Sequence, residues 1–129
     1  MSHHRETVMA DRAPAAVGPY SHAVKSGGLL FCSGQVPLDP ETGKLVEGDV
    51  GLQVKRCLDS LAAVAEAGGA QLSDAVRGAV KLTDMGDWQQ VNEAYGTYFT
   101  SAPPARVAIG VAALPLGARV EVDAVIALG

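Results

Sequence analysis

The sequence has few aromatic side chains and no long apolar run. Tryptophan, tyrosine and phenylalanine make up 5% of its 129 residues, so its core has to be mainly aliphatic. No apolar run approaches the roughly 20 residues needed to cross a bilayer. The N-terminal "MSHHRETVMADRA" also lacks the apolar segment of a secretory signal peptide. We therefore expect a cytoplasmic protein with no membrane partner.

Positive charge is also scarce. Fourteen acidic residues against ten basic ones give a formal net charge of -4, and no stretch of the chain is rich in lysine or arginine. Nucleic-acid-binding proteins usually present a basic patch to the phosphate backbone. The sequence therefore disfavours a nucleic-acid partner.

Cysteine and histidine show no pattern typical of a metal site. Cys32 and Cys57 form no CxxC pair, and we interpret both as buried reduced thiols, in keeping with a cytoplasmic location. His3 and His4 are adjacent but have no further ligand at metal-binding spacing. We expect no metal site.

The length and a composition of 48% hydrophobic and 19% charged residues indicate one globular domain over residues 1–129. Period-two and helical patterns predict two helices on one face of a sheet, an α+β fold. The predicted strands are 6–9, a hairpin around residues 26–28, 74–85, 105–111 and 118–128. The first predicted helix begins at Asp49 and ends at Gly68–Gly69. The second begins at about Asp87 and has an apolar stripe that runs to Phe99.

The last two predicted strands carry charges among apolar residues. The period of two places Val107 and Ile109 on the helix-covered face, and Arg106 and Glu121 on the other face. If these strands form a hairpin that is symmetric about Leu114, Arg106 and Glu121 are cross-strand neighbours. One interpretation is a solvated salt bridge worth at most about 1 kcal/mol. The other is a ligand site, since arginine suits bidentate capture of a carboxylate.

Four successive stretches resemble the motifs of the RidA (YjgF) enamine/imine deaminase family over nearly the whole chain. They are "APAAVGPYSHAV", "FCSGQVPLDPETGKLVEGD", "LTDMGDWQQVNEAYGTYF" and "PPARVAIGVAALPLGARVEVDAVIA". The resemblance implies a chorismate-mutase-like α+β fold with a mixed β-sheet and two helices packed on one face. It also implies a homotrimer with active sites at subunit interfaces. The implied reaction is hydrolysis of reactive enamines and imines, such as 2-aminoacrylate and 2-iminopropanoate, to 2-keto acids and ammonia, without a cofactor.

The resemblance also implies catalytic roles for two residues. Arg106, in "PPARV", matches the arginine that binds the substrate carboxylate, and Glu121, in "RVEVD", matches the glutamate that activates or orients the attacking water. Their alternative is the ion pair described above.

Four further residues match substrate-binding positions of the family, each with a structural alternative. Ser33 and Gly34 match a cleft-lining pair, or they form a bulge. Tyr20 matches a tyrosine that closes the pocket, or it is a packed aromatic. Asn92 matches an asparagine near the site, or it holds a neighbouring loop.

The sequence departs from the family at two positions near these motifs. Ala108 replaces a common cysteine, which removes thiol chemistry there, and His22 replaces a usual glutamine. We interpret His22 as a packing or edge residue. Two other functions stay open: a non-catalytic, regulatory trimer that binds small carboxylates, and a ribonuclease or translation inhibitor, which the acidic balance disfavours.

Overall fold

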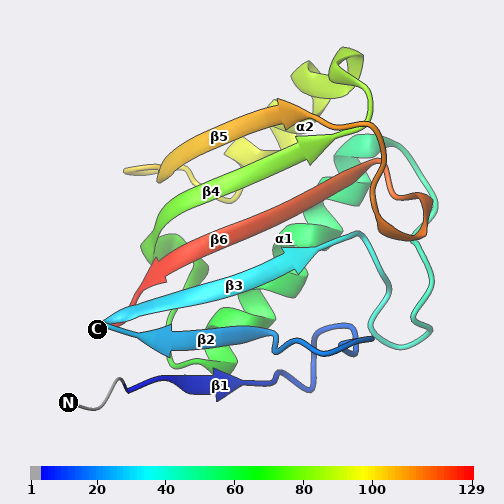
Figure 1. Ribbon diagram of the computed structural model, residues 1–129. Coiled ribbons are helices and arrows are strands. Elements are labelled where there is room, and N and C mark those ends of the chain that lie inside the picture. Colours follow the sequence, from blue (N-terminus) through cyan, green and yellow to red (C-terminus); the bar gives the residue numbers. More distant parts are fainter. Residues whose placement is uncertain (1–3) are drawn as a thin grey trace.

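The computed structural model describes residues 4–129, so His3 lies outside the described residues. It contains a six-stranded mixed sheet with both α-helices on one face (Figure 1). The strand order is β1-β2-β3-β6-β4-β5. The bounds are β1 Glu6–Val8, β2 Ala23–Ser26, β3 Leu29–Gln35, α1 Val50–Ala67, β4 Ala75–Leu82, α2 Trp88–Gly96, β5 Ala105–Gly110 and β6 Val120–Ala127. This confirms the predicted α+β fold.

Local sequence signals set the first hairpin and the first helix. Gly27 and Gly28 adopt positive φ angles of 60° and 79° between β2 and β3, which suits a tight two-residue turn. Asp49 caps α1, since its carboxylate accepts a hydrogen bond from the Leu52 amide at 2.8 Å. Gly69, with φ of 81°, follows the helix end. These elements confirm the sequence prediction.

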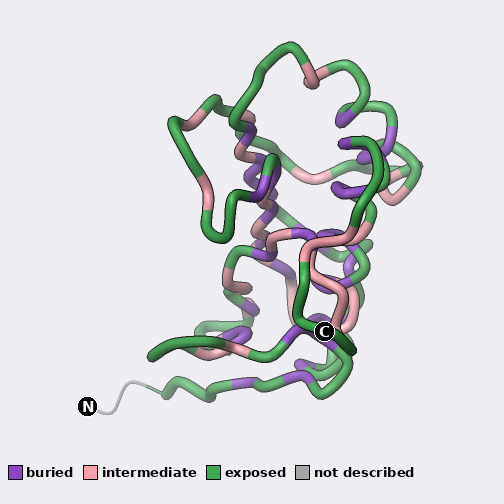
Figure 2. The backbone as a smooth tube through the Cα atoms, turned by 90° about the vertical axis from the view of Figure 1, so that its right-hand side faces the viewer, coloured by how far each residue is buried: buried purple, intermediate pink, exposed green. Residues whose placement is uncertain are grey.

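The core lies between the sheet and the helices. Fully buried aliphatic side chains of α1, such as Leu58 and Leu61, meet those of the covered sheet face, such as Val122 and Ile126. The other sheet face carries no helix, and Figure 1 looks directly onto it; we call it the open face. In Figure 2 buried stretches alternate with exposed ones along the chain, as expected for elements with one covered side.

The predicted hairpin of the last two strands is wrong. β4 lies between β5 and β6, with β5 parallel and β6 antiparallel to it. The period of two identifies residues that share a face within a strand, but it does not identify the neighbouring strand. The chain from β4 passes through α2 before it returns as β5, and such a crossover gives a parallel pair. β5 is therefore an edge strand.

The faces predicted for β5 are consequently wrong as well. Arg106 pairs with Gly78, on the helix-covered face, and Val107 and Ile109 point to the open face, where these residues are 38% and 46% exposed. The faces of β6 are as predicted, with Val122 buried under the helices.

Two smaller predictions also need correction. The apolar pattern of residues 74–85 predicts Val76, Val80 and Leu82 on one side of the strand, but the register shifts between Ala75 and Arg77, and Val76 is exposed. The stripe that predicted α2 runs past the helix end at Gly96, and Tyr98 and Phe99 pack against the core from the following segment.

Candidate functional site

The predicted site residues fall into two groups. Tyr20, Ser33, Gly34 and Glu121 line one cavity of about 440 Å³, which we call the Glu121 cavity. Apolar groups supply most of the rest of its wall, namely Pro14, Ala15, Val17, Val36, Leu38, Pro115 and Leu116. A mostly apolar cavity with a few polar groups is the usual form of a small-molecule site.

Glu121 projects from β6 onto the open face, where its side chain is 15% exposed. Its Oε1 atom lies 3.5 Å from the ammonium of Lys81, the residue opposite it on β4. The same oxygen lies over Gly34 of β3, so closely that a methyl group at that position would overlap it. Glu121 is therefore confined between a glycine backbone and an ammonium group.

Ser33 and Gly34 lie where the register of β3 against β6 shifts, between Cys32 and Gln35. The bulge that we had considered as an alternative to the cleft-lining role is therefore present, and both residues still line the cavity. The Ser33 hydroxyl donates to the Ser21 carbonyl at 2.6 Å, which leaves its lone pairs available to a ligand. The bulge and the lining role are compatible.

Arg106 and Asn92 make up the second group. The guanidinium Nη1 donates to the Asn92 side-chain oxygen at 2.9 Å. The same guanidinium lies over the rings of Trp88 and Tyr95, at 4.7 and 5.1 Å from their centroids. Thus α2 supplies an amide and two aromatic faces that fix the side chain. A hollow of about 320 Å³ lies beside Arg106, and Pro103 is among the residues that line it.

One chain does not bring Arg106 and Glu121 together, contrary to the predicted cross-strand contact. Arg106 pairs with Gly78 and Glu121 with Lys81, so the two side chains point to opposite sheet faces. Three residues along a strand and two strand spacings separate them, a Cα distance of roughly 14 Å. The alternative prediction, a surface salt bridge between these two residues, is therefore also wrong. Within residues 4–129 no carboxylate pairs with Arg106.

Burial suppresses ionisation of the nearby thiols and phenols. Burial, reinforced by the charge of Asp123, raises the pKa of Cys32 to about 12, and burial likewise raises the pKa of Cys57. Both are free thiols. Burial raises the pKa of Tyr95, an effect that Arg106 partly opposes. Neither cysteine is a thiolate nucleophile near neutral pH.

His22 supports the wall of the Glu121 cavity. It is buried, its Nδ1 accepts from the Ala10 amide at 2.8 Å, and its Nε2 lies 2.8 Å from the Pro14 carbonyl. Since Nδ1 is an acceptor, the ring proton is on Nε2, which donates to that carbonyl. The ring therefore ties two points of the connector that contributes Pro14 to the cavity. This confirms the packing role predicted for His22.

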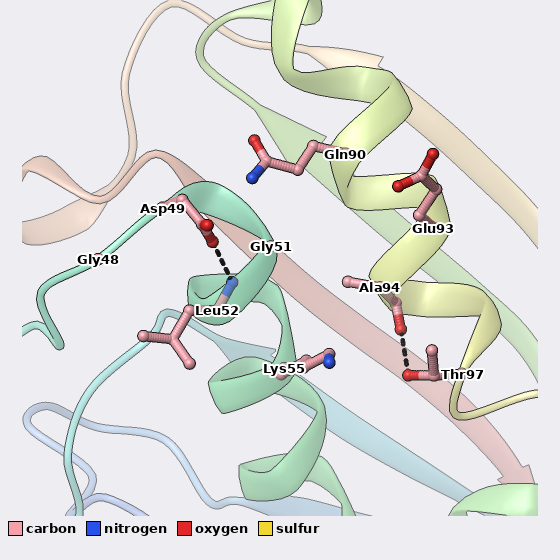
Figure 3. Close-up of a pocket in the computed structure, with 9 residues that line it drawn as sticks. All are labelled: Gly48, Asp49, Gly51, Leu52, Lys55, Gln90, Glu93, Ala94 and Thr97. Carbon is pink, nitrogen blue, oxygen red and sulfur yellow. Dashed lines mark hydrogen bonds between the residues drawn. The ribbon is translucent and has the colours of Figure 1, made fainter.

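A third hollow lies between α1 and α2 (Figure 3). Lys55 and Glu93 reach it from the two helices. It contains none of the predicted site residues.

Metal and membrane features can be assessed for residues 4–129. That part of the chain holds no group of three or more histidine, cysteine, aspartate or glutamate side chains arranged to bind a metal ion. None of its helices is both long enough and apolar enough to cross a bilayer.

Sequence reasoning missed three residues around the predicted ones. Trp88 and Tyr95 were assigned to the apolar stripe of α2, and their seven-residue spacing gave no sign of an arginine between them. Lys81 is not among the site residues predicted from the sequence. A lysine among the apolar residues of "GAVKL" is nevertheless a usable signal, because lysine is rarely buried without a partner.

The fold and the site residues define a class of small chorismate-mutase-like α+β proteins, with an arginine on the edge strand and a glutamate on a central strand. Residues 10–128 match the family described as Endoribonuclease L-PSP. The chain belongs to this family, which is the RidA (YjgF) family that its motifs resemble.

Three similar proteins illustrate the family. Protein DfrA of Myxococcus xanthus is 50% identical over 123 residues, 94% of each chain. The mouse 2-iminobutanoate/2-iminopropanoate deaminase is 45% identical over 125 residues, 97% of this chain and 93% of the mouse protein. The crystal structure of RidA from an Antarctic Psychrobacter bacterium superposes with a TM-score of 0.91 at 41% identity, covering 95% of this chain and 99% of that one.

The contact between Gly34 and Glu121 gives a testable prediction. Gly34→Ala should lower the free energy of unfolding by about 1 kcal/mol, because the new methyl group overlaps the Glu121 carboxylate and forces that side chain to shift. In a Glu121→Ala background the same change should cost much less, because the atoms nearest to that methyl group are gone. Urea unfolding of the four proteins measures this coupling. Equal costs in both backgrounds would show that Glu121 does not lie over Gly34.

Proposed function

We propose that the protein is a cytoplasmic homotrimer that hydrolyses reactive 2-imino acids, the tautomers of enamines such as 2-aminoacrylate, to 2-keto acids and ammonia. The mouse relative that is 45% identical carries the name 2-iminobutanoate/2-iminopropanoate deaminase. The free thiols of Cys32 and Cys57 are in keeping with the reducing cytoplasm. The proposed reaction needs water and no cofactor.

The observation that carries this proposal is the state of Arg106. Its guanidinium is held by Asn92 and two aromatic rings, yet no carboxylate from residues 4–129 pairs with it. An exposed, fixed guanidinium without a counter-ion is suited to the carboxylate of an organic acid, which it can hold by two parallel hydrogen bonds. Arg106 therefore serves as the substrate anchor.

Besides an anchor for the substrate, the reaction needs a group that moves protons, and Glu121 supplies it. Water adds to the imine carbon as Glu121 takes one of its protons and passes it to the nitrogen, which forms a carbinolamine. Glu121 then takes the hydroxyl proton and passes it to the amino nitrogen, the carbon–nitrogen bond breaks as the carbonyl forms, and ammonia departs. The carboxylate ends unchanged, so the balance is imine plus water to keto acid plus ammonia.

The positions of these two groups support a site shared between subunits. Arg106 and Glu121 lie on opposite sheet faces of one chain, so the two residues of the same chain cannot act together in one site. In the trimer, Arg106 and Asn92 of one copy face the Glu121 cavity of the next. The exposed apolar side chains of Val107 and Ile109 on the open face then become buried between copies.

A non-catalytic trimer that binds small carboxylates is the second candidate. Such a protein needs Arg106, whereas a carboxylate in the adjoining cavity repels an anionic ligand and has no use in pure binding. A ribonuclease is disfavoured despite the family's description, because the net charge is -4 and no stretch of the sequence is rich in lysine or arginine.

Removal of the anchor tests the enzyme hypothesis. With an imine generated in situ by an amino-acid oxidase, Arg106→Ala should lower kcat/KM for keto-acid release by at least about 100-fold, since two charge-assisted hydrogen bonds are lost. Arg119→Ala is the control, because this exposed arginine pairs with Asp87 and lines neither hollow. A wild-type-like rate in Arg106→Ala would exclude the proposed anchor.

Loss of the base separates catalysis from binding. Glu121→Gln keeps the size of the side chain but cannot accept a proton, so kcat should fall by about 10²–10⁴-fold. The dissociation constant for a 2-keto acid, measured by calorimetry, should change little. Full turnover in this variant would contradict the base role of Glu121.

Subunit mixing tests the shared site. Arg106→Ala and Glu121→Ala chains should each be inactive, but when they are unfolded and refolded together at equal amounts, about a quarter of the interfaces combine an intact arginine with an intact glutamate. Activity should therefore recover to about a quarter of the wild-type value. Light scattering should give three times the 13.2 kDa chain mass. A stable trimer without recovery would mean that the site is not shared between chains.

A further inference from the structure

Lys81 is the cation that faces Glu121. It lies on β4, between the edge strand β5 and β6, directly opposite Glu121 on β6, and its side chain is 33% exposed. Its ammonium is 3.5 Å from Glu121 Oε1 and 3.5 Å from Asp123 Oδ2. Glu121 and Asp123 are two residues apart on the same face of β6, so the single ammonium lies between two carboxylates.

The two oxygens of Glu121 have different surroundings. Oε1 is next to Lys81 and lies over Gly34, so closely that a Cβ at that position would overlap it. Within the described chain, Oε2 makes no hydrogen bond. Glu121 lines the cavity while Lys81 does not, and Oε2 is the Glu121 oxygen that no described cation or donor engages.

We infer that Lys81 is a positioning residue for the reaction, which holds Glu121 by Oε1 so that Oε2 faces the substrate. This inference rests on the proposed function. The ammonium also balances the charge of two neighbouring carboxylates, which otherwise repel each other and drive Glu121 out of its place beside Gly34. Burial of the open face between subunits makes this pairing stronger than at a free surface.

Lys81 does not act as a nucleophile in this arrangement. An amine that attacks an imine or a keto acid has to be neutral and exposed to the ligand. Here the group is paired with two carboxylates and lies behind Glu121, outside the cavity wall. Its effect on the reaction passes through Glu121 alone.

The experiment compares Lys81→Met with Lys81→Arg. The methionine keeps the bulk but removes the charge, and should lower kcat by about 10- to 100-fold through misplacement of the base, with less than about a threefold change in 2-keto acid affinity. The arginine keeps the charge and should restore kcat to within about threefold of wild type. Lys25→Met is the matched control. Lys25 is another strand lysine that is 32% exposed, and it pairs with Glu6 at 3.1 Å near the opposite edge of the sheet, between β1 and β2.

A Glu121→Gln background distinguishes positioning from a general structural role. If Lys81 acts only through Glu121, Lys81→Met should cause no further loss of kcat once Glu121 has been replaced. An equal loss in both backgrounds would contradict the inference, and so would a wild-type rate in Lys81→Met. Labelling of Lys81 by borohydride in the presence of pyruvate would also overturn it, because it would reveal a Schiff base.

The failure of the proposed function has a different outcome. If wild-type protein releases no keto acid faster than the buffer does, the deaminase proposal fails before any Lys81 variant is compared. If wild type and Lys25→Met are active and Lys81→Met is equally active, only the inference about Lys81 fails.

Discussion

The parallel pairing of β4 with β5 is the constraint on which the rest of the arrangement depends. Arg106 on β5 pairs with Gly78 of β4, and Glu121 on β6 pairs with Lys81 of the same strand. Gly78 and Lys81 are an odd number of residues apart, so the arginine and the glutamate face opposite sides of the sheet. The same pairing brings Arg106 under α2, where Asn92 and two aromatic rings fix it. One topological choice thus places the arginine on the edge strand and keeps it away from Glu121 of the same chain.

The second determinant is the irregular end of β3. A regular strand with an ordinary side chain at position 34 leaves no space for the Glu121 carboxylate, whereas the register shift and the glycine allow it to lie against the backbone. The connector tied down by His22 closes the other side of the cavity. The pocket therefore arises from local departures from regular geometry on an otherwise ordinary sheet.

Much of this fold could be predicted from local signals. Paired glycines at a hairpin, an aspartate that caps a helix and the apolar period of β6 each act over a few residues, and the structure agrees with all of them. The strand order could not be read in this way, because alternation describes one strand at a time and says nothing of its neighbours. The motif residues were recognised by resemblance, but their grouping around two hollows and the part of Lys81 depend on contacts between distant strands.

The enclosure of Arg106 has a thermodynamic consequence. A free arginine side chain has several rotatable bonds, and a ligand that captures it has to overcome the loss of that freedom. Here the amide of Asn92 and the faces of Trp88 and Tyr95 restrict those rotations when the chain folds. The entropy is lost at folding, so the guanidinium is already oriented before any ligand arrives.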